Sequence, residues 1–490
     1  MDTPHTLTGL VVAPWDPAYA TARVDYNARF KPFSPDYVMY AKAVADVEVA
    51  VRWAARHRIP FRVRSGGHSY EAYSLLNHGL VIDVSRLNHI HWDPATELWH
   101  IGAGAQLLEV YQALWDQQEV TIPGGSCPTV GIAGLTLGGG FGLISRQFGL
   151  TIDALAAVEM IDRLGRRVFV SDRQHADLFW ALRGAGANNF GVITEFTFHA
   201  SPVSSVTIFS IDWQWARLPE VVRLFQHWAD PKRLDRRLTA ILTLPAQTSG
   251  HISLVGEFLG DQASLHDILE PLLSIPGRTA YVTNVMSYIE AMRHFAGVAG
   301  DVSRWMIHGV PAHDTFKNTS AYAYQMLPEP AIQALVKALA DPPGPACLVQ
   351  LGTMGGRIAD VKPEATAFCH RLARFDLQYQ AYWSEPERAA SHIRWVEEFR
   401  RALEPWTVGA YVNYCDANIR DWPDAYYGKN LRRLLSIKQQ WDPGNLFSYP
   451  QGLSQLVPPR SWIKRSLSWP PPTSPLTHRD TRSQWTVGSP

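Results

Sequence analysis

The chain has 490 residues, which is enough for two or three folding units of ordinary size. Lys plus Arg and Asp plus Glu both number 45, and this neutral balance gives no reason to expect a nucleic-acid or acidic-membrane partner. No apolar run approaches the roughly 20 residues that span a bilayer, and the polar first ten residues lack a secretion-signal pattern, so we expect a cytoplasmic protein.

The first 200 residues alternate short helices with short β-rich runs. The apolar spacing of Val44, Val47 and Val51 predicts a helix over 44–57, which Pro60 ends. Further helices are expected around 107–114 and over 177–182. Strands are expected over 61–64, 80–84, 155–161, 167–170 and 192–198, of which 155–161 and 167–170 form a hairpin.

The chain changes character near residue 203, where the glycine clusters thin out and strands mix with helices. This mixture indicates a second α+β unit built on a sheet. The expected strands are 206–213, 238–244 and 411–414; the expected helices are 219–228 and 429–440, followed by a turn at 441–445. From about residue 457 the composition is rich in Pro and Ser, so we expect a disordered tail over 457–490.

The glycine-rich segments do not fit the usual dinucleotide fingerprint. After Gly102 and Gly104, Leu107 stands where the third glycine of GxGxxG belongs, and Gly186 follows a helix rather than a strand. Three glycine-rich turns nevertheless remain in the first 200 residues. Their backbone N–H groups suit a pyrophosphate. For any one of them a plain tight turn is the better explanation, but for all three together it is the weaker one.

Two of these turns present a His or a Cys side chain near a possible phosphate-binding loop. His68 stands in the segment SGGHSY at 65–70, and Cys127 stands in GGSCPTVG at 124–131. A lone His or Cys is more often a packed residue than a functional one. The four cysteines, Cys127, Cys347, Cys369 and Cys415, match no zinc spacing, so we expect no metal site.

Four blocks of the sequence occur in one order. They are RVRSGGHSY at 62–70; GSCPTVG at 125–131 with GGGFG at 138–142; LRGAG at 182–186 with NFGV at 189–192; and YVNY at 411–414 with YYG at 426–428 and DPGNLF at 442–447. Together they resemble the berberine-bridge-enzyme-like branch of the vanillyl-alcohol-oxidase flavoproteins. The resemblance covers about residues 32–453 and is highly specific because both the His and the Cys are present.

The resemblance implies an α+β fold with three parts. A two-subdomain FAD-binding domain of the PCMH type covers 32–202, a substrate domain with an antiparallel sheet covers 203–405, and a segment over 406–453 returns to the FAD domain. FAD would be attached covalently at two points, with His68 joined to the flavin 8α-methyl and Cys127 to flavin C6. The other residues implied to line FAD are Arg64, Ser65, Gly66, Gly67, Ser69, Gly125, Val130, Gly131, Gly134, Gly139, Gly142, Gly191, Val192, Tyr411 and Asn413.

The same resemblance places the catalytic base on Tyr414. A phenol has an unperturbed pKa of about 10 and needs help to act at neutral pH. Residues 375–379 resemble the family's strand that faces the flavin, and Asp376 and Gln378 would share one face of it. A carboxylate alone would raise the pKa of the phenol, so Asp376 is expected to accept the proton onward, and Gln378 to donate a hydrogen bond to the phenolate.

Two further tyrosines are weighed against Tyr414. Tyr70, next to His68, is a second candidate near the flavin. In a strand over 411–414, Tyr411 and Asn413 would share one face and Tyr414 would take the other. We interpret Tyr411 as a packed aromatic residue rather than a base.

Val130 bears on the electron acceptor, because family members with a bulky Leu at this position tend to exclude oxygen. The smaller Val indicates an oxidase that releases hydrogen peroxide. We expect a small hydroxylated substrate, an oligosaccharide or a secondary-metabolite alcohol, and molecular oxygen as partners of a monomer or homodimer. The alternatives are a dehydrogenase with another acceptor and a non-catalytic flavin-binding protein. At 366–371, Cys369 stands where the family usually has Pro, which puts the substrate-side turn in doubt.

Overall fold

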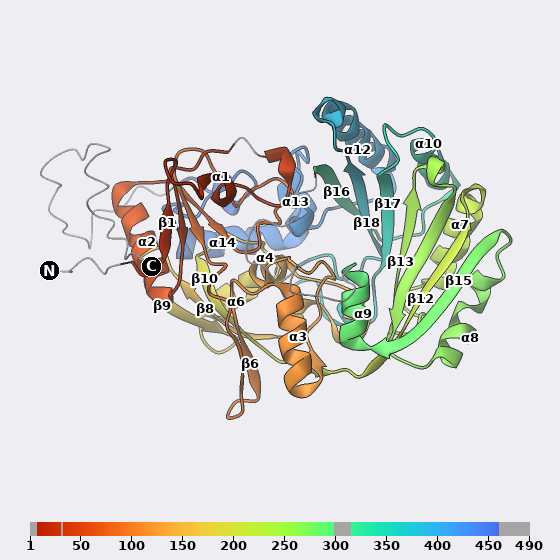
Figure 1. The fold of residues 1–490 in the computed structure, drawn as a ribbon, viewed down its shortest axis with the longest axis horizontal. Coiled ribbons are helices and arrows are strands. Elements are labelled where there is room, and N and C mark those ends of the chain that lie inside the picture. The colour runs from red at the N-terminus through yellow and green to blue at the C-terminus, as the bar shows by residue number, and fades with distance from the viewer. Residues whose placement is uncertain (1–6, 31–32, 298–314, 460–490) are drawn as a thin grey trace, which may run out of the picture.

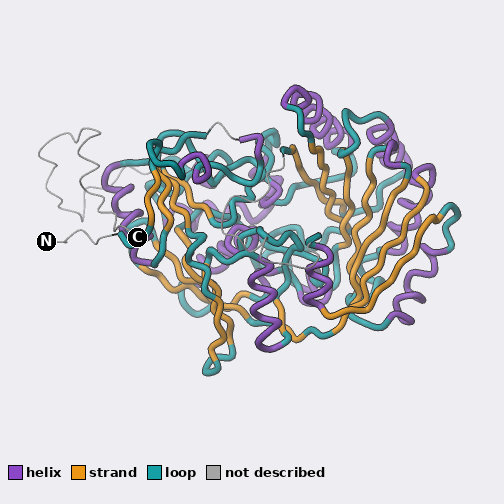
Figure 2. Tube along the Cα trace, viewed as in Figure 1, coloured by secondary structure: helices purple, strands orange, loops and turns teal. Residues whose placement is uncertain are grey.

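The structure is a computed structural model that describes residues 7–30, 33–297 and 315–459. Two groups of strands lie side by side along the long axis, with loops and short helices between them (Figures 1 and 2). The predicted tail over 457–490 lies outside the described residues from 460 onward. Within the described part of the chain, no helix has the length and apolarity that a bilayer crossing requires. The location in the cell and the oligomeric state stay predictions.

The first sheet has the order β1-β2-β4-β3, formed by Leu10–Val12, Tyr37–Tyr40, Leu80–Asp83 and Phe61–Arg64. β2, β4 and β3 run parallel because the helix α2 (Val44–His57) connects β2 to β3. Val47, Ala50, Val51 and Ala54 are buried at helical spacing on one side of α2. This arrangement ends β3 directly before the His68 turn.

The second sheet is antiparallel, with the order β5-β6-β10-β8-β9. Its strands are Ile90–Asp93, Leu98–Gly102, Val192–Phe198, Leu155–Ile161 and Arg167–Ser171. The two-residue strands β7 (Val120–Thr121) and β11 (Ser201–Pro202) pair nearby. The helices of this half are α1 (Tyr19–Ala22), α3 (Leu107–Gln118), α4 (Ile132–Gly138), α5 (Ser145–Phe148) and α6 (Ala176–Leu182), with 3₁₀ helices at Ala28–Phe30 and Thr151–Asp153.

The third sheet has seven antiparallel strands in the order β15-β12-β14-β13-β17-β18-β16. They are Arg278–Ser287, Ser205–Gln214, His251–Phe258, Leu238–Pro245, Cys347–Thr353, Phe375–Tyr382 and Phe316–Ala323. The helices α7 (Leu218–Trp228), α8 (Gln262–Leu273), α10 (Glu329–Ala340) and α12 (Ala389–Leu403) lie on its outer side (Figure 1). Shorter pieces are α9 (Tyr288–Phe295), α11 (Arg357–Asp360) and 3₁₀ helices at Trp215–Arg217, Gln247–Ser249 and Pro386–Arg388.

The alternation of side chains along β18 decides which face of this sheet is apolar. Phe375, Leu377, Tyr379 and Ala381 belong to the core beneath the outer helices. Asp376 and Gln378 therefore point to the opposite face, toward the first half of the molecule. The predicted sharing of one face by Asp376 and Gln378 is confirmed.

The C-terminal segment returns to the first half of the molecule, where α13 and α14 lie among the N-terminal elements (Figure 1). It contains α13 (Trp422–Tyr427), α14 (Leu431–Trp441) and 3₁₀ helices at Val412–Tyr414, Gly428–Asn430 and Leu453–Gln455. Lys438 is fully buried and donates to the backbone oxygens of Asn189 and Phe447 and to Asp442. These bonds tie the end of α14 to the loop before β10.

Most predicted elements are confirmed, including the helix over 44–57, the hairpin of β8 and β9, and the strands near 192–198 and 375–379. The mixture of helices with antiparallel sheets confirms the α+β expectation. The strand expected over 411–414 is wrong, because this segment is a 3₁₀ turn. The domain boundaries stay predictions.

Candidate active site

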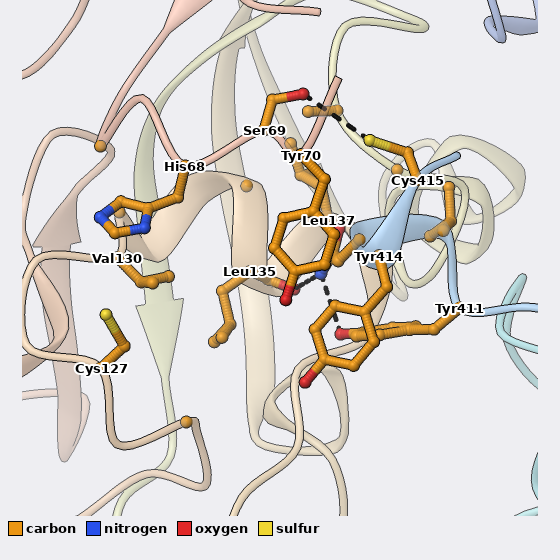
Figure 3. A pocket seen from close by; sticks show the side chains of 18 of the residues that line it. His68, Ser69, Tyr70, Cys127, Val130, Leu135, Leu137, Tyr411, Tyr414 and Cys415 are labelled. Atoms are coloured by element: carbon orange, nitrogen blue, oxygen red, sulfur yellow. Dashed lines mark hydrogen bonds between the residues drawn. The ribbon is translucent and has the colours of Figure 1, made fainter. Parts of the chain in front are cut away.

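One cavity of about 550 Å³ lies between the two halves of the molecule. Its wall combines the His68 turn, the Cys127 loop, helix α4, the inner face of the third sheet and the 411–415 turn. Figure 3 shows His68, Cys127 and Val130 at one end and Tyr70, Tyr411 and Tyr414 at the other. The volume falls in the usual range for small-molecule and cofactor sites, roughly 300–1,000 Å³.

The two predicted attachment residues share this cavity because their loops touch through glycines. A Cβ on Gly66 would lie 2.3 Å from the nitrogen of Gly131, and one on Gly131 would lie 2.4 Å from the nitrogen of Gly66. Only glycine at both positions allows this contact. His68 follows Gly66 by two residues and Cys127 precedes Gly131 by four, so both side chains reach the same end of the cavity.

Desolvation makes the imidazole of His68 neutral at physiological pH. Burial lowers its pKa to about 4, and Nε2 lies 2.8 Å from Oγ1 of Thr129. Cys127 is exposed on the cavity side and is a thiol rather than part of a disulfide. The chain thus presents a neutral imidazole and a thiol, both of which are nucleophiles able to form a bond to a ligand.

The cavity also has room for a flat, extended cofactor along α4. A Cβ on Gly134 would meet nothing within 4 Å, and one on Gly125 nothing closer than 3.8 Å. A ligand can therefore approach the backbone at both positions. The predicted cofactor residues that line this cavity are Ser65, Gly66, Gly67, His68, Ser69, Gly125, Cys127, Val130, Gly131, Gly134, Gly142, Gly191, Tyr411 and Asn413. The residues present therefore fit FAD.

Three predicted cofactor residues, Arg64, Gly139 and Val192, lie outside the cavity wall. The guanidinium of Arg64 is turned into the protein, where it pairs with Asp83 at 2.5 Å and donates to the backbone of Ala22. Val192 is fully buried in β10. Gly139, at a φ of 132°, packs against the ring of Phe368. All three residues were predicted to line FAD because they stand inside the quoted sequence blocks. The structure gives them packing or ion-pair roles instead.

The turn at 411–414 corrects the expected placement of its side chains. Tyr411, Asn413 and Tyr414 all line the cavity, and the rings of Tyr411 and Tyr414 are 5.0 Å apart. The hydroxyl of Tyr411 accepts hydrogen bonds from the nitrogen of Gly140 at 2.8 Å and from Asn413 at 2.9 Å. Tyr411 is therefore occupied as a hydrogen-bond acceptor, in keeping with a packed aromatic residue.

Tyr414 stacks on Tyr70, with ring centroids 5.2 Å apart and an interplanar angle of 4°. Burial, followed by the charge of Asp376, raises the pKa of Tyr414 well above 10. Burial also raises the pKa of Asp376, to about 7. The expected hydrogen bond from Gln378 goes to the hydroxyl of Tyr70 at 2.6 Å and not to Tyr414. Gln378 therefore does not stabilise a phenolate at Tyr414, and burial and the charge of Asp376 raise the pKa of Tyr414 unopposed by that bond.

A buried cluster of ion pairs connects the segments that carry Tyr70 and Tyr414. Nζ of Lys317, on β16, lies 2.6 Å from Glu71 and 2.5 Å from Asp416. Glu71 follows Tyr70 in sequence, and Asp416 comes two residues after Tyr414. One buried ammonium group thus connects both tyrosine-bearing segments to the third sheet. The charge of Lys317 also lowers the pKa of Asp416 against the effect of burial.

Three residues that shape the site were not expected from the sequence. A Cβ on Gly352 would lie 2.2 Å from Oδ1 of Asp376, its partner in the sheet register, so the glycine makes room for this carboxyl group. The ring of Tyr26 stacks on His68 at 4.2 Å. Thr129 contacts His68 and stands inside the quoted GSCPTVG block, which was the only available signal.

Comparisons with known proteins agree with this site. The sequence matches a family described as "FAD binding domain" over residues 35–171 and one described as "Berberine and berberine like" over 410–454. It is 38% identical over 465 residues to the uncharacterized FAD-linked oxidoreductase YgaK of Bacillus subtilis, covering 94% of this chain and 98% of that protein. It is 30% identical over 446 residues to a chitooligosaccharide oxidase of Gibberella zeae, covering 87% and 89% of the two chains.

Solved structures give the same result. Physcomitrella patens BBE-like 1 superposes with a TM-score of 0.85 at 31% identity, covering 92% of this chain and 97% of that one. A variant of Phl p 4 described as a glucose oxidase superposes with a TM-score of 0.82 at 26% identity, covering 91% and 96%. The fold and the site thus define an FAD-dependent oxidoreductase with a PCMH-type architecture. The chain belongs to the berberine-bridge-enzyme-like family.

Proposed function

We propose that the protein is an oxidase that acts on a CH–OH group of an uncharged sugar-like substrate. The proposal rests on one observation: Tyr414, Tyr70 and Asp376 face the same cavity as His68 and Cys127. FAD bound there would supply the acceptor for the hydride that leaves the substrate carbon. The residues of the chain would bind and orient the hydroxyl group and remove its proton.

The charge of the cavity wall supports an uncharged substrate. Among the described residues that line it, Asp376 is the only carboxyl group and His68 the only imidazole, and neither Lys nor Arg occurs. An anionic substrate would find no cationic partner and would meet the carboxylate. Tyr70, Tyr414 and Tyr382 supply aromatic and hydroxyl surface of the kind that suits a sugar ring. The oligosaccharide oxidase among the relatives is consistent with this class.

We assign the removal of the proton to Tyr414 and Asp376 acting together. Burial opposes formation of a phenolate at Tyr414, so the phenol alone is a poor base. Asp376 has a pKa of about 7 and is a competent acceptor near neutral pH. The substrate proton would pass to the oxygen of Tyr414 while the phenol proton passes on to Asp376. Tyr70, fixed by Gln378, would orient the substrate beside them.

We also propose that His68 and Cys127 each form a covalent bond to the flavin. The two nucleophiles lie at one end of the cavity on separate loops, so two bonds would fix both the position and the tilt of a bound ring. A denaturing mass measurement tests this proposal. We expect the mass of FAD to persist on the wild type, and to be lost only when His68→Ala and Cys127→Ala are combined.

Molecular oxygen is the proposed final acceptor, because Val130 is a small side chain beside both attachment residues (Figure 3). Two solved structures of one relative, Phl p 4, are relevant to whether oxygen or another acceptor is used. Phl p 4 is described as a grass pollen allergen with glucose dehydrogenase activity, and its isoleucine-to-valine variant as a glucose oxidase. The dehydrogenase name keeps a non-oxygen acceptor as the second candidate. Slow reoxidation of the reduced enzyme in air would favour that candidate.

The first prediction tests the reaction directly. Under anaerobic conditions, members of a panel of oligosaccharides and alcohols should bleach the flavin absorbance, and admitting air should restore it with release of peroxide. We expect Tyr414→Phe to slow bleaching by about 10²-fold or more, since it removes the proton-accepting oxygen. Tyr322→Phe is the matched control, because Tyr322 is buried outside the cavity wall. Failure of every donor to bleach the wild type would refute the proposal.

A further inference from the structure

Two side chains hold the imidazole of His68 in one orientation. The ring of Tyr26 stacks on it at 4.2 Å with an interplanar angle of 20°, and the Tyr26 nitrogen donates to the carbonyl of Gly67 at 2.9 Å. Oγ1 of Thr129 lies 2.8 Å from Nε2. The stack fixes the plane of the ring, and the hydroxyl group fixes its rotation within that plane. These two contacts therefore fix the position of the ring before a ligand arrives.

We propose that Thr129 is the positioning residue that presents Nδ1 of His68 to the flavin for covalent attachment, an inference that rests on the proposed bond at His68. Thr129 is buried and does not line the cavity, whereas His68 does. Nε2 is thus engaged on the protein side, and Nδ1 forms no hydrogen bond within the described part of the chain. When the Thr129 hydroxyl accepts a hydrogen bond from Nε2–H, the lone pair of a neutral imidazole resides on Nδ1.

The atoms and electrons of the attachment reaction balance when molecular oxygen is the oxidant. One bond forms between Nδ1 and the carbon of the flavin 8α-methyl group. One hydrogen leaves that carbon and one leaves Nε2, and both, with two electrons from the new linkage, end on molecular oxygen as hydrogen peroxide. The acceptor oxygen of Thr129 lies on the exit line of the Nε2 hydrogen. The imidazole stays neutral and nucleophilic at physiological pH, because burial lowers the pKa of His68.

Thr129 also links the Cys127 loop to the orientation of His68. It stands two residues after Cys127, in the loop that touches the His68 turn through Gly66 and Gly131. Attachment at His68 therefore depends on the conformation of the Cys127 loop and not on the Cys127 thiol itself. This dependence separates a positioning role for Thr129 from any cooperation between the two covalent bonds.

The test uses the Cys127→Ala protein, in which His68 is the remaining attachment residue. Purified enzyme is incubated with FAD in air, and the flavin retained on the His68 peptide after acid precipitation is followed with time by mass spectrometry. We expect Thr129→Val to slow this retention about tenfold, because orientation of the nucleophile is lost. Thr129→Ser keeps the hydroxyl group and should react within about twofold of the parent.

Thr136→Val is the matched control. Thr136 is equally buried, on α4, and its hydroxyl group has no hydrogen-bond partner among the described residues. Equal rates for Thr129→Val and the parent would overturn the inference, as would equal slowing by Thr129→Val and Thr136→Val or failure of Thr129→Ser to react. A parent protein without flavin on the His68 peptide would overturn both this inference and the proposed bond. Bleaching by sugars would still be measurable with dissociable FAD.

Discussion

At the scale of single residues, the ionisation of Asp376 and the ionisation of Tyr414 disfavour each other. Each is more stable uncharged when buried, and a negative charge on either disfavours ionisation of the other. Gly352 has no side chain, and this leaves room for the carboxyl group of Asp376. The pair therefore holds one mobile proton, and the carboxyl group is the member whose pKa, about 7, lies within the physiological range.

The second prediction concerns the pH dependence of this pair. The base form of Asp376 is the carboxylate, so the rate of anaerobic flavin reduction should rise with pH up to about 7 and fall tenfold per pH unit below it. Asp376→Asn keeps the size of the side chain but removes the base. We expect it to lower the rate about 10²-fold or more and to abolish the dependence near pH 7. A preserved pH profile in this variant would assign the titration to another group.

At the scale of elements, the length of the sequence pattern decides what could be predicted. The helix over 44–57 and the strand near 192–198 follow long apolar patterns and were predicted correctly. The turn at 411–414 was predicted as a strand because YVNY alternates over only four residues. Tertiary contacts override that pattern, since the nitrogen of Tyr411 donates to the hydroxyl of Ser320 and Asn413 donates to the carbonyl of Leu135. Helix α4 was not expected either, because IAGLTLG contains two glycines.

The third prediction tests the contact between α4 and this turn. A Cβ on Gly138 would lie 2.1 Å from Oδ1 of Asn413, so Gly138→Ala forces the amide away. We expect Gly138→Ala to lower the free energy of unfolding by about 1–3 kcal/mol through overpacking. Asn413→Ala should lower it by about 1–3 kcal/mol through the loss of its hydrogen bonds to Leu135 and Tyr411. The double variant should lose less than the sum in urea unfolding; strict additivity would show that the two residues do not interact.

At the scale of the whole molecule, the site exists only where distant segments meet. The family resemblance placed His68 and Cys127 correctly in one cavity, because short motifs carry that information. It could not supply the stack of Tyr26 on His68 or the pairing of Gly352 with Asp376, which depend on packing between segments. The contacts of Arg146 also depend on packing between distant segments and could not be predicted from the sequence. This fully buried residue of α5 donates to the carbonyls of Leu234, Leu238 and Met354 and thereby joins the two halves.

Between the two halves lies one buried acid whose role is not explained by the site. Glu257, on β14, is fully buried, and neither carboxyl oxygen has a hydrogen-bond partner among the described residues. Burial raises the pKa of Glu257 to about 8. Burial and, after it, the charge of Glu257 raise the pKa of Tyr288 on α9. A buried acid without partners binds its proton more tightly in the folded state than in the unfolded chain.

The fourth prediction follows from the sign of this shift. The folded pKa of Glu257, about 8, exceeds the unfolded value, so its stabilising contribution is complete below about pH 4 and is lost as the pH rises through 8. Glu257→Gln cannot ionise. In guanidinium unfolding at pH 8.5 it should exceed the wild type in free energy of unfolding by about 1–3 kcal/mol, and at pH 5 the difference should shrink toward zero. The exposed Glu398→Gln control should change little at either pH. An equal gain at both pH values would show that packing, and not the proton on Glu257, sets the stability of the contact between the halves.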